Sequence, residues 1–312
     1  MPLRQDRESE IGSQRTEKYS RSMSSTEPGL MVLLLDQSAS MKHKWGSVET
    51  DMTKAECVAM NVNRVLAELC LRNTKDVSGR PQVKPRVEVS ILGYGCTAST
   101  DKESGKTDWK YRVEPAFSGK LGGRSVVGLP ELASNYLRLQ TFDGKDGQAV
   151  GRIPVWIEPH GNGPTPMGMA FEKATGIVSE WTTRHQESFP PLVLNFTDGE
   201  VNDVKPKKLQ KIAEELRGVS TNDGSVLLFN CHISSKQGPS CMLPSCTDEV
   251  PDEGPARLMF EISSPFPPRM RSLAKARGFQ DVNDKTRGFA YNVDVVNFVH
   301  FLQIGTVGLA GT

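Results

Sequence analysis

An unbroken apolar run at residues 30–35, Leu-Met-Val-Leu-Leu-Leu, most constrains what this chain can fold into. A run with no polar residue on either face is typical of a strand that is buried on both sides of a parallel sheet. Similar runs recur at residues 192–196 and 226–230, and the alternating segment 86–94 predicts another strand. Strands of this kind need helices to cover both of their faces.

Apolar residues at helical spacing fill the segments between these strands. They predict the helices 51–72, 167–181, 206–217 and 293–303, two short helices at 256–263 and 267–277, and a last strand at 288–291. Strands that alternate with helices form parallel sheets through right-handed crossovers. The sequence therefore predicts an α/β fold: a Rossmann-like, doubly wound, mostly parallel sheet with helices on both faces.

Residues 97–159 differ from the rest, because they are rich in glycine and hold only short apolar runs. We expect an edge hairpin with loops that elaborates one side of the sheet and has no core of its own. The polar segment 1–28 is expected to be a flexible tail. Residues 29–305 then form a single domain, and residues 306–312 a C-terminal tail.

The charge balance limits the partners of this chain. It holds 38 basic and 37 acidic residues among 312, a formal net charge of +1. Without a basic excess, a general role in coating nucleic acid is not expected. The longest apolar run is far shorter than the roughly 20 residues of a membrane helix, and no secretory signal is visible at the start. We expect a protein of the cytoplasm with no membrane partner.

The six cysteines are scattered along the chain. A disulfide framework usually needs an oxidising compartment and a small core, and neither is indicated. One group, Cys231, His232, Cys241 and Cys246, resembles a zinc site but lacks the closely paired ligands of such sites. Free thiols are the favoured interpretation, and zinc is the alternative.

Three polar loops carry the candidate chemistry. Asp36, Ser38 and Ser40 follow the first strand, Thr165 precedes a helix, and Asp198 follows the strand 192–196. Ligands of open parallel sheets bind beyond the carboxyl ends of the strands. Carboxylates and hydroxyls are oxygen donors, which Mg²⁺, Mn²⁺ and Ca²⁺ prefer. If the neutral hydroxyls bind such an ion directly, it keeps much of its charge and can attract a carboxylate from another molecule.

Each of these residues also has an ordinary explanation. Thr165 before Pro166 is a common start of a helix. The two serines could satisfy backbone groups of a turn, and Asp198-Gly199 is an ordinary turn dipeptide. Taken together, however, five oxygen donors at strand ends of one alternating pattern favour a metal site.

The order and spacing of these loops resemble the metal-ion-dependent adhesion site of the von Willebrand factor A domain family. The resemblance is carried by D-x-S-x-S, the single threonine and T-D-G, and it extends from residue 30 to the predicted C-terminal helix. It implies that Ser38, Ser40 and Thr165 bind the metal directly and that Asp36 and Asp198 act mostly through water. Ala39 departs from the pattern, because the family commonly has glycine there.

The resemblance also implies a function. We expect a non-enzymatic, metal-dependent protein-interaction module of an intracellular, bacterial type, with no catalytic residue. Such modules serve as scaffolds or regulatory subunits, often with ATPases, kinases or phosphatases, and here the partner would supply an acidic residue.

Three alternatives remain. A Mg²⁺-dependent phosphoryl-transfer hydrolase would use Asp36 as nucleophile, but Ser38 stands where its acid/base aspartate is needed. A dinucleotide-binding enzyme would have G-x-G-x-x-G after the first strand, which is missing. An extracellular adhesin would need a signal sequence.

Other residues near these loops allow more than one interpretation. His160 could line the mouth of the site, and Glu200 and Asp203 could add negative potential to it. Met41 and Trp45 could form a rim for a partner or pack under the first helix.

Overall fold

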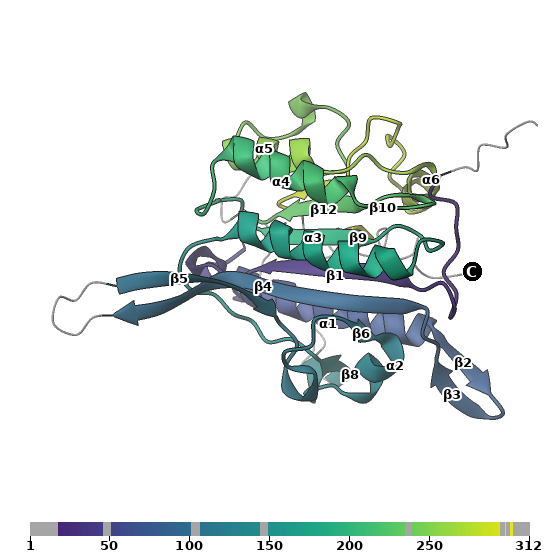
Figure 1. Cartoon of the computed structure of the whole chain (residues 1–312). Helices are drawn as coiled ribbons and strands as arrows, with labels where there is room; N and C mark the ends of the chain where they lie inside the picture. Colours follow the sequence, from purple (N-terminus) through teal and green to yellow (C-terminus); the bar gives the residue numbers. More distant parts are fainter. Residues whose placement is uncertain are drawn as a thin grey trace, which may run out of the picture.

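The computed structural model describes residues 18–45, 51–100, 107–143, 149–234, 239–293, 297, 300 and 301. Within this part of the chain, an eight-stranded sheet forms the centre of the molecule (Figure 1). Its strand order is β13-β14-β12-β9-β1-β4-β5, and β6 pairs with β4. The strands are β1 (Gly29–Asp36), β4 (Val87–Thr100), β5 (Thr107–Pro115), β6 (Val127–Gly128), β9 (Leu192–Thr197), β12 (Leu227–His232), β13 (Cys241–Met242) and β14 (Phe289–Tyr291).

Helices and short hairpins surround this sheet. The α-helices are α1 (Lys54–Arg72), α2 (Leu129–Ser134), α3 (Met167–Arg184), α4 (Pro206–Gly218), α5 (Gly254–Ile262) and α6 (Pro268–Ala276), and the 3-10 helices are η1 (Ala39–Lys42), η2 (Gly119–Leu121) and η3 (Thr247–Glu249). The hairpins pair β2 (Thr74–Val77) with β3 (Arg80–Val83), β7 (Arg138–Asp143) with β8 (Ala149–Val155), and β10 (Ser220–Thr221) with β11 (Gly224–Ser225).

The central strands confirm the predicted mostly parallel sheet. β1 is parallel to both of its neighbours, β4 and β9, and β9 and β12 are parallel as well. The chain passes from β1 to β4 on one side and later adds β9 on the other side of β1. The strand order therefore reverses between β1 and β9, and ligands of open α/β sheets bind at such a point.

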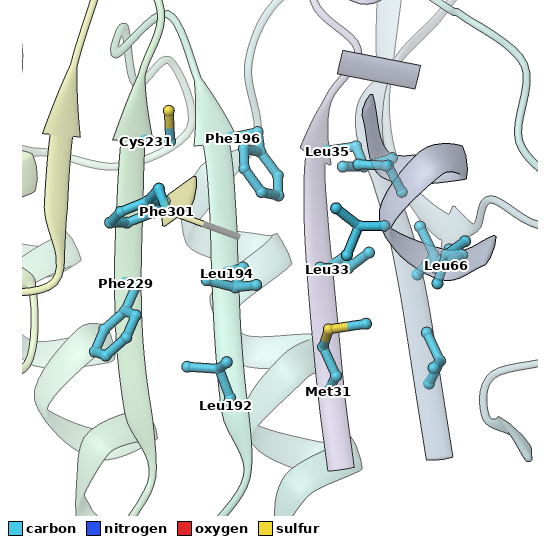
Figure 2. Packing of buried hydrophobic residues seen from close by; sticks show 14 of the residues in the cluster. Met31, Leu33, Leu35, Leu66, Leu192, Leu194, Phe196, Phe229, Cys231 and Phe301 are labelled. Atoms are coloured by element: carbon cyan, nitrogen blue, oxygen red, sulfur yellow. The ribbon is translucent and has the colours of Figure 1, made fainter. Parts of the chain in front are cut away.

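Alternate side chains of β1 enter two separate cores. Met31, Leu33 and Leu35 pack in the core that also holds residues of α1, α2 and α6. Leu30, Val32 and Leu34 pack on the opposite face with residues of α3, α4 and α5. Figure 2 shows the first of these cores, with Leu192, Leu194 and Phe196 of β9 beside the β1 side chains. Burial on both faces explains the unbroken apolar runs.

The elaborated region contains the expected edge hairpin, formed by β4 and β5. Only Val87–Tyr94 of β4 pairs with β1, so the remainder of β4 extends beyond the end of β1 together with β5. Figure 1 shows this hairpin reaching past the carboxyl end of β1. The rest of the region adds α2 and the β7–β8 hairpin. Leu132 and Trp156 from this region are buried in the same core as α1, so the region has no separate core.

Both ends of the chain lie partly outside the described residues. Of the segment 1–28, expected to be a flexible tail, residues 18–28 pack against the domain: the Tyr19 N–H donates to the Asp223 carbonyl oxygen, and Met23 is buried in the core. Of the predicted helix 293–303, residues 297, 300 and 301 are described as helical, and Phe301 is buried (Figure 2). Residues 302–312, including the predicted C-terminal tail, lie outside the described part.

None of the helices in the described part of the chain has both the length and the apolar character that a membrane crossing requires.

Candidate metal centre

Two loops meet at the point where the strand order reverses. Asp36 is the last residue of β1, and Asp198 directly follows β9. Since β1 and β9 are parallel and adjacent, both carboxylates lie at the same edge of the sheet. The structure therefore brings together the two aspartates that the sequence pattern singled out.

Asp36 is held entirely by protein donors. Its carboxylate accepts a hydrogen bond from the Ser38 N–H at 2.8 Å on Oδ1 and one from the Thr197 hydroxyl at 2.8 Å on Oδ2. The pKa of Asp36 is raised to about 7, mainly by burial and then by the nearby Asp198 charge, while the hydrogen bonds from Ser38 and Thr197 act in the opposite direction. A positive charge at this site would favour the ionised form.

The two serines of the loop lie beside each other. Ser38 is buried, and its Oγ lies 2.9 Å from Ser40 Oγ. The Ser38 side chain does not cap η1, although Ser38 stands at the N-cap position. When one hydroxyl donates to the other, both still have lone pairs for a further partner. These oxygens are therefore available to a cation.

Thr165 lies on a loop that is tied to the loop of the two serines. The Ala39 N–H donates to the Gly163 carbonyl oxygen at 2.8 Å, and the Asn162 N–H donates to the Gln37 carbonyl oxygen at 2.6 Å. Thr165 itself is buried. These backbone bonds hold the Thr165 loop against the loop of the two serines.

The role of Thr165 as an ordinary helix cap is not what the structure shows. The N-cap of α3 is Pro166, and the carboxylate of Asp203 instead accepts from the N–H groups of Gly168 and Met169 at 3.2 and 2.9 Å. Asp203 therefore stabilises the start of α3, where a negative charge is favourable. The Thr165 hydroxyl therefore does not cap α3.

Asp198 has an incomplete set of partners. Its Oδ2 accepts from Lys54 Nζ at 3.1 Å, while its Oδ1 is buried and has no hydrogen-bond partner among the described residues. The next residue, Gly199, has a φ of +92°, and a Cβ there would lie 2.4 Å from the His232 ring. Glycine is therefore required at this turn directly after Asp198.

Lys54 is a residue of this site that no sequence motif singled out. Its side chain is buried at the first turn of α1, on the same helix face as Val58 and Asn61, which are also buried. A charged residue on the buried stripe of a helix is uncommon unless it is paired. The position of Lys54, four residues before Val58, is the signal that could have identified it.

The residues present fit a hard divalent cation. Two carboxylates and two hydroxyls meet at one edge. One buried carboxylate oxygen has no partner within the described ranges, and a bound ion would remove the desolvation cost that it carries. Among the described residues, no three His, Cys, Asp or Glu side chains gather where they could hold a metal. A site here would therefore depend on the serine and threonine hydroxyls.

The alternative zinc group does not assemble. Cys231 is buried in β12, whereas Cys246 is exposed, and all six cysteines are free.

His160 lies near the candidate site and is largely exposed. The pKa of its imidazole is lowered by the partial burial of the ring and by the charges of Arg112 and Lys42. Met41 and Trp45 are both buried in the core with α1, so they pack under the helix and do not form a rim.

The sequence matches no protein-family model and no curated protein. Among solved structures, the fold is similar to the manganese-loaded TRAP protein of Plasmodium vivax, with a TM-score of 0.42, 13% identity, and 92% of this chain and 75% of that chain covered. It is also similar to a von Willebrand factor type A protein from Catenulispora acidiphila, with a TM-score of 0.29, 12% identity, and 66% and 33% of the two chains covered. The PilB minor pilin from Streptococcus sanguinis gives a TM-score of 0.36 and 8% identity, with 90% and 61% covered.

The chain thus spans about a third of the Catenulispora protein and less than two thirds of the pilin. Similarities at this level carry no argument about function. The function of the site has to be argued from its own geometry.

Proposed function

We propose that this chain is a metal-dependent protein-interaction module that binds an acidic residue of its partner through a divalent cation. Mg²⁺ is the proposed ion, with Mn²⁺ or Ca²⁺ as alternatives. The observation that carries the proposal is the buried Oδ1 of Asp198, which has no hydrogen-bond partner in the described part of the chain and lies beside the carboxylate of Asp36 and the paired hydroxyls. The residues that would hold the ion are Asp36, Ser38, Ser40, Thr165 and Asp198.

The bound ion would supply a concentrated positive charge with an open coordination position. The protein contributes a fixed set of oxygens, of which the serine and threonine hydroxyls are neutral. Because few negative ligands offset its charge, the ion would attract a carboxylate from outside. A chain with a formal net charge of +1 needs no basic surface for such a contact.

Three partly exposed side chains extend this site into a surface that suits a protein partner. Trp109 and Tyr111 of β5 are 44% and 37% exposed, and Met169 of α3 is 40% exposed. The Trp109 ring lies 2.6 Å from where a Cβ on Gly163 would be, close to Thr165. The proposed partner segment therefore carries an aspartate or glutamate for the ion and an adjacent apolar residue for this rim.

The cellular role belongs to the same proposal. The resemblance to the von Willebrand factor A family favours a scaffold or regulatory subunit of a cytoplasmic, bacterial-type complex, with an ATPase, kinase or phosphatase as partner. Six free cysteines are consistent with a reducing compartment.

The hydrolase alternative is disfavoured by the surroundings of Asp36. Both of its carboxylate oxygens already accept hydrogen bonds, from Ser38 and Thr197, and the side chain is buried. A nucleophilic carboxylate needs an oxygen that a substrate can reach, and Asp36 is only 2% exposed. Ser38 also cannot replace an acid/base aspartate at neutral pH.

The proposal is tested with Mn²⁺-loaded protein and two peptides that differ only in an aspartate or an asparagine next to a leucine. Displacement of metal-bound water by the aspartate peptide should lower the water-proton relaxation enhancement, and the asparagine peptide should leave it unchanged. Trp109→Ala should lower the affinity for the aspartate peptide without changing the affinity for Mn²⁺. An equal response to both peptides contradicts carboxylate docking, and Mg²⁺-dependent turnover of a phosphate ester that Asp36→Ala abolishes would favour the hydrolase.

A further inference from the structure

The ammonium of Lys54 is a cation that the fold itself places in the candidate metal centre. Its Nζ lies 3.1 Å from Asp198 Oδ2, and the two side chains are only 3% and 7% exposed. Among the described residues, the Asp198 carboxylate is the single hydrogen-bond acceptor of this ammonium. An ammonium has three N–H donors, so it is held here by charge and not by a full set of hydrogen bonds.

The backbone around Lys54 fixes this position. Thr53 and Glu56 form a reciprocal capping box at the start of α1. The Lys54 N–H donates to the His43 carbonyl oxygen at 2.9 Å. Lys54 is thus anchored on a rigid helix start that faces the strand ends.

This position is unfavourable for a lysine without a counter-charge. The N-terminus of a helix carries a partial positive charge, which repels a cation in the first turn. Removal of an ammonium from water is also costly unless it is paired. The carboxylate of Asp198, which belongs to the proposed metal site, compensates for both effects.

We propose that Lys54 is a built-in competitor of the divalent cation for Asp198. This inference rests on the metal site proposed above. In the metal-free protein the ammonium neutralises Asp198 and keeps the site folded. A divalent ion can take the Asp198 oxygens only if the ammonium leaves, because two cations repel each other strongly at contact distance in a buried site. Metal occupancy and the position of Lys54 are therefore alternatives, and Lys54 lowers the affinity for the ion.

The first test measures Mn²⁺ affinity in wild type and in Lys54→Met, which keeps the length and apolar character of the stem and removes the charge. Lys54→Met should bind the ion about tenfold or more tightly, because the competing charge is gone. Lys44→Met is the matched control, since Lys44 pairs with Asp51 in an exposed ion pair of the same segment. Its affinity should equal that of wild type.

The second test needs no variant, so it also holds if Lys54→Met fails to fold. Amine acetylation of wild type, mapped by mass spectrometry, should be slow at Lys54 in chelator and faster in saturating Mn²⁺, while Lys44 reacts equally in both. Equal Mn²⁺ affinity in wild type and Lys54→Met, or Lys54 labelling that saturating metal does not accelerate, would overturn the inference and leave the metal site intact. Failure of both proteins to bind Mn²⁺ would overturn the metal site, and the inference with it.

Discussion

An aspartate stands at the carboxyl end of both β1 and β9, but the two carboxylates have different partners. Asp36 has a protein hydrogen-bond donor on each carboxylate oxygen, whereas Asp198 has a lysine on one oxygen and no partner among the described residues on the other. Both side chains are almost completely removed from solvent. The same residue type at neighbouring strand ends therefore has two distinct environments.

This difference separates a carboxylate that organises the loop from one that meets a cation. Asp36 orders the Ser38 backbone and Thr197 and would act on an ion mainly through its charge. Asp198 is already paired with one cation, Lys54, which a divalent ion would have to displace. The predictions below test this division.

The largest effect on stability is expected for Asp198→Ala in metal-free protein. It leaves the buried ammonium of Lys54 without a counter-charge, which should lower the free energy of unfolding by about 3–5 kcal/mol. Urea unfolding in the presence of chelator measures this change. If Lys54 causes the loss, adding Lys54→Met to Asp198→Ala should restore much of the stability. A double variant as unstable as Asp198→Ala would contradict this explanation.

A smaller loss is expected for Thr197→Val, which keeps the shape of the side chain. The substitution removes the hydroxyl that donates to Asp36 Oδ2 and accepts from the Gly199 N–H at 2.9 Å. Two buried groups lose a partner, so the free energy of unfolding should fall by about 1–3 kcal/mol.

Thr182→Val is the matched control for this change, because Thr182 is also buried and donates only to a helix carbonyl, that of Ser179. Its loss should stay below about 1 kcal/mol. Equal losses at both positions would show that Thr197 has no special role in the loop.

The most gradual effect is the pH dependence that Asp36 contributes, which amounts to at most about 1.4 kcal/mol per pH unit. Burial raises its pKa from 3.8 to about 7, so the folded state binds the proton more tightly than the unfolded chain. The stability of the metal-free protein should therefore fall as pH rises from about 4 to about 7 and then level off, with a change of about 1 kcal/mol between about pH 6 and pH 7. Asp36→Asn should remove this component in urea unfolding at several pH values. A pH dependence of stability that persists in Asp36→Asn would come from another titratable group and would contradict this prediction.

The alternating fold could be predicted because burial of strands and helix faces leaves a direct pattern in the sequence. The apolar run 30–35 became β1, and the stripes at helical spacing became α1, α3 and α4. The shared location of Asp36 and Asp198 could be predicted for a similar reason, since strand ends of a parallel sheet share one edge; their role as metal ligands stays a prediction.

What the sequence did not reveal depends on contacts between distant segments. The pairing of Lys54 with Asp198 joins residues 144 positions apart, and no local pattern contains it. The same holds for Tyr19 and Met23, whose segment looks polar but packs against the domain around Asp223. Composition alone assigned that segment to a tail.

The most direct test of the account is the stoichiometry and affinity of Mn²⁺ binding, measured by titration calorimetry. We predict one site per chain in wild type, loss of binding in Asp198→Ala, and unchanged binding in Glu200→Gln, an exposed carboxylate two residues further along. Mn²⁺ binding that survives Asp198→Ala, or no binding in wild type and Lys54→Met alike, would contradict a metal centre at this edge of the sheet.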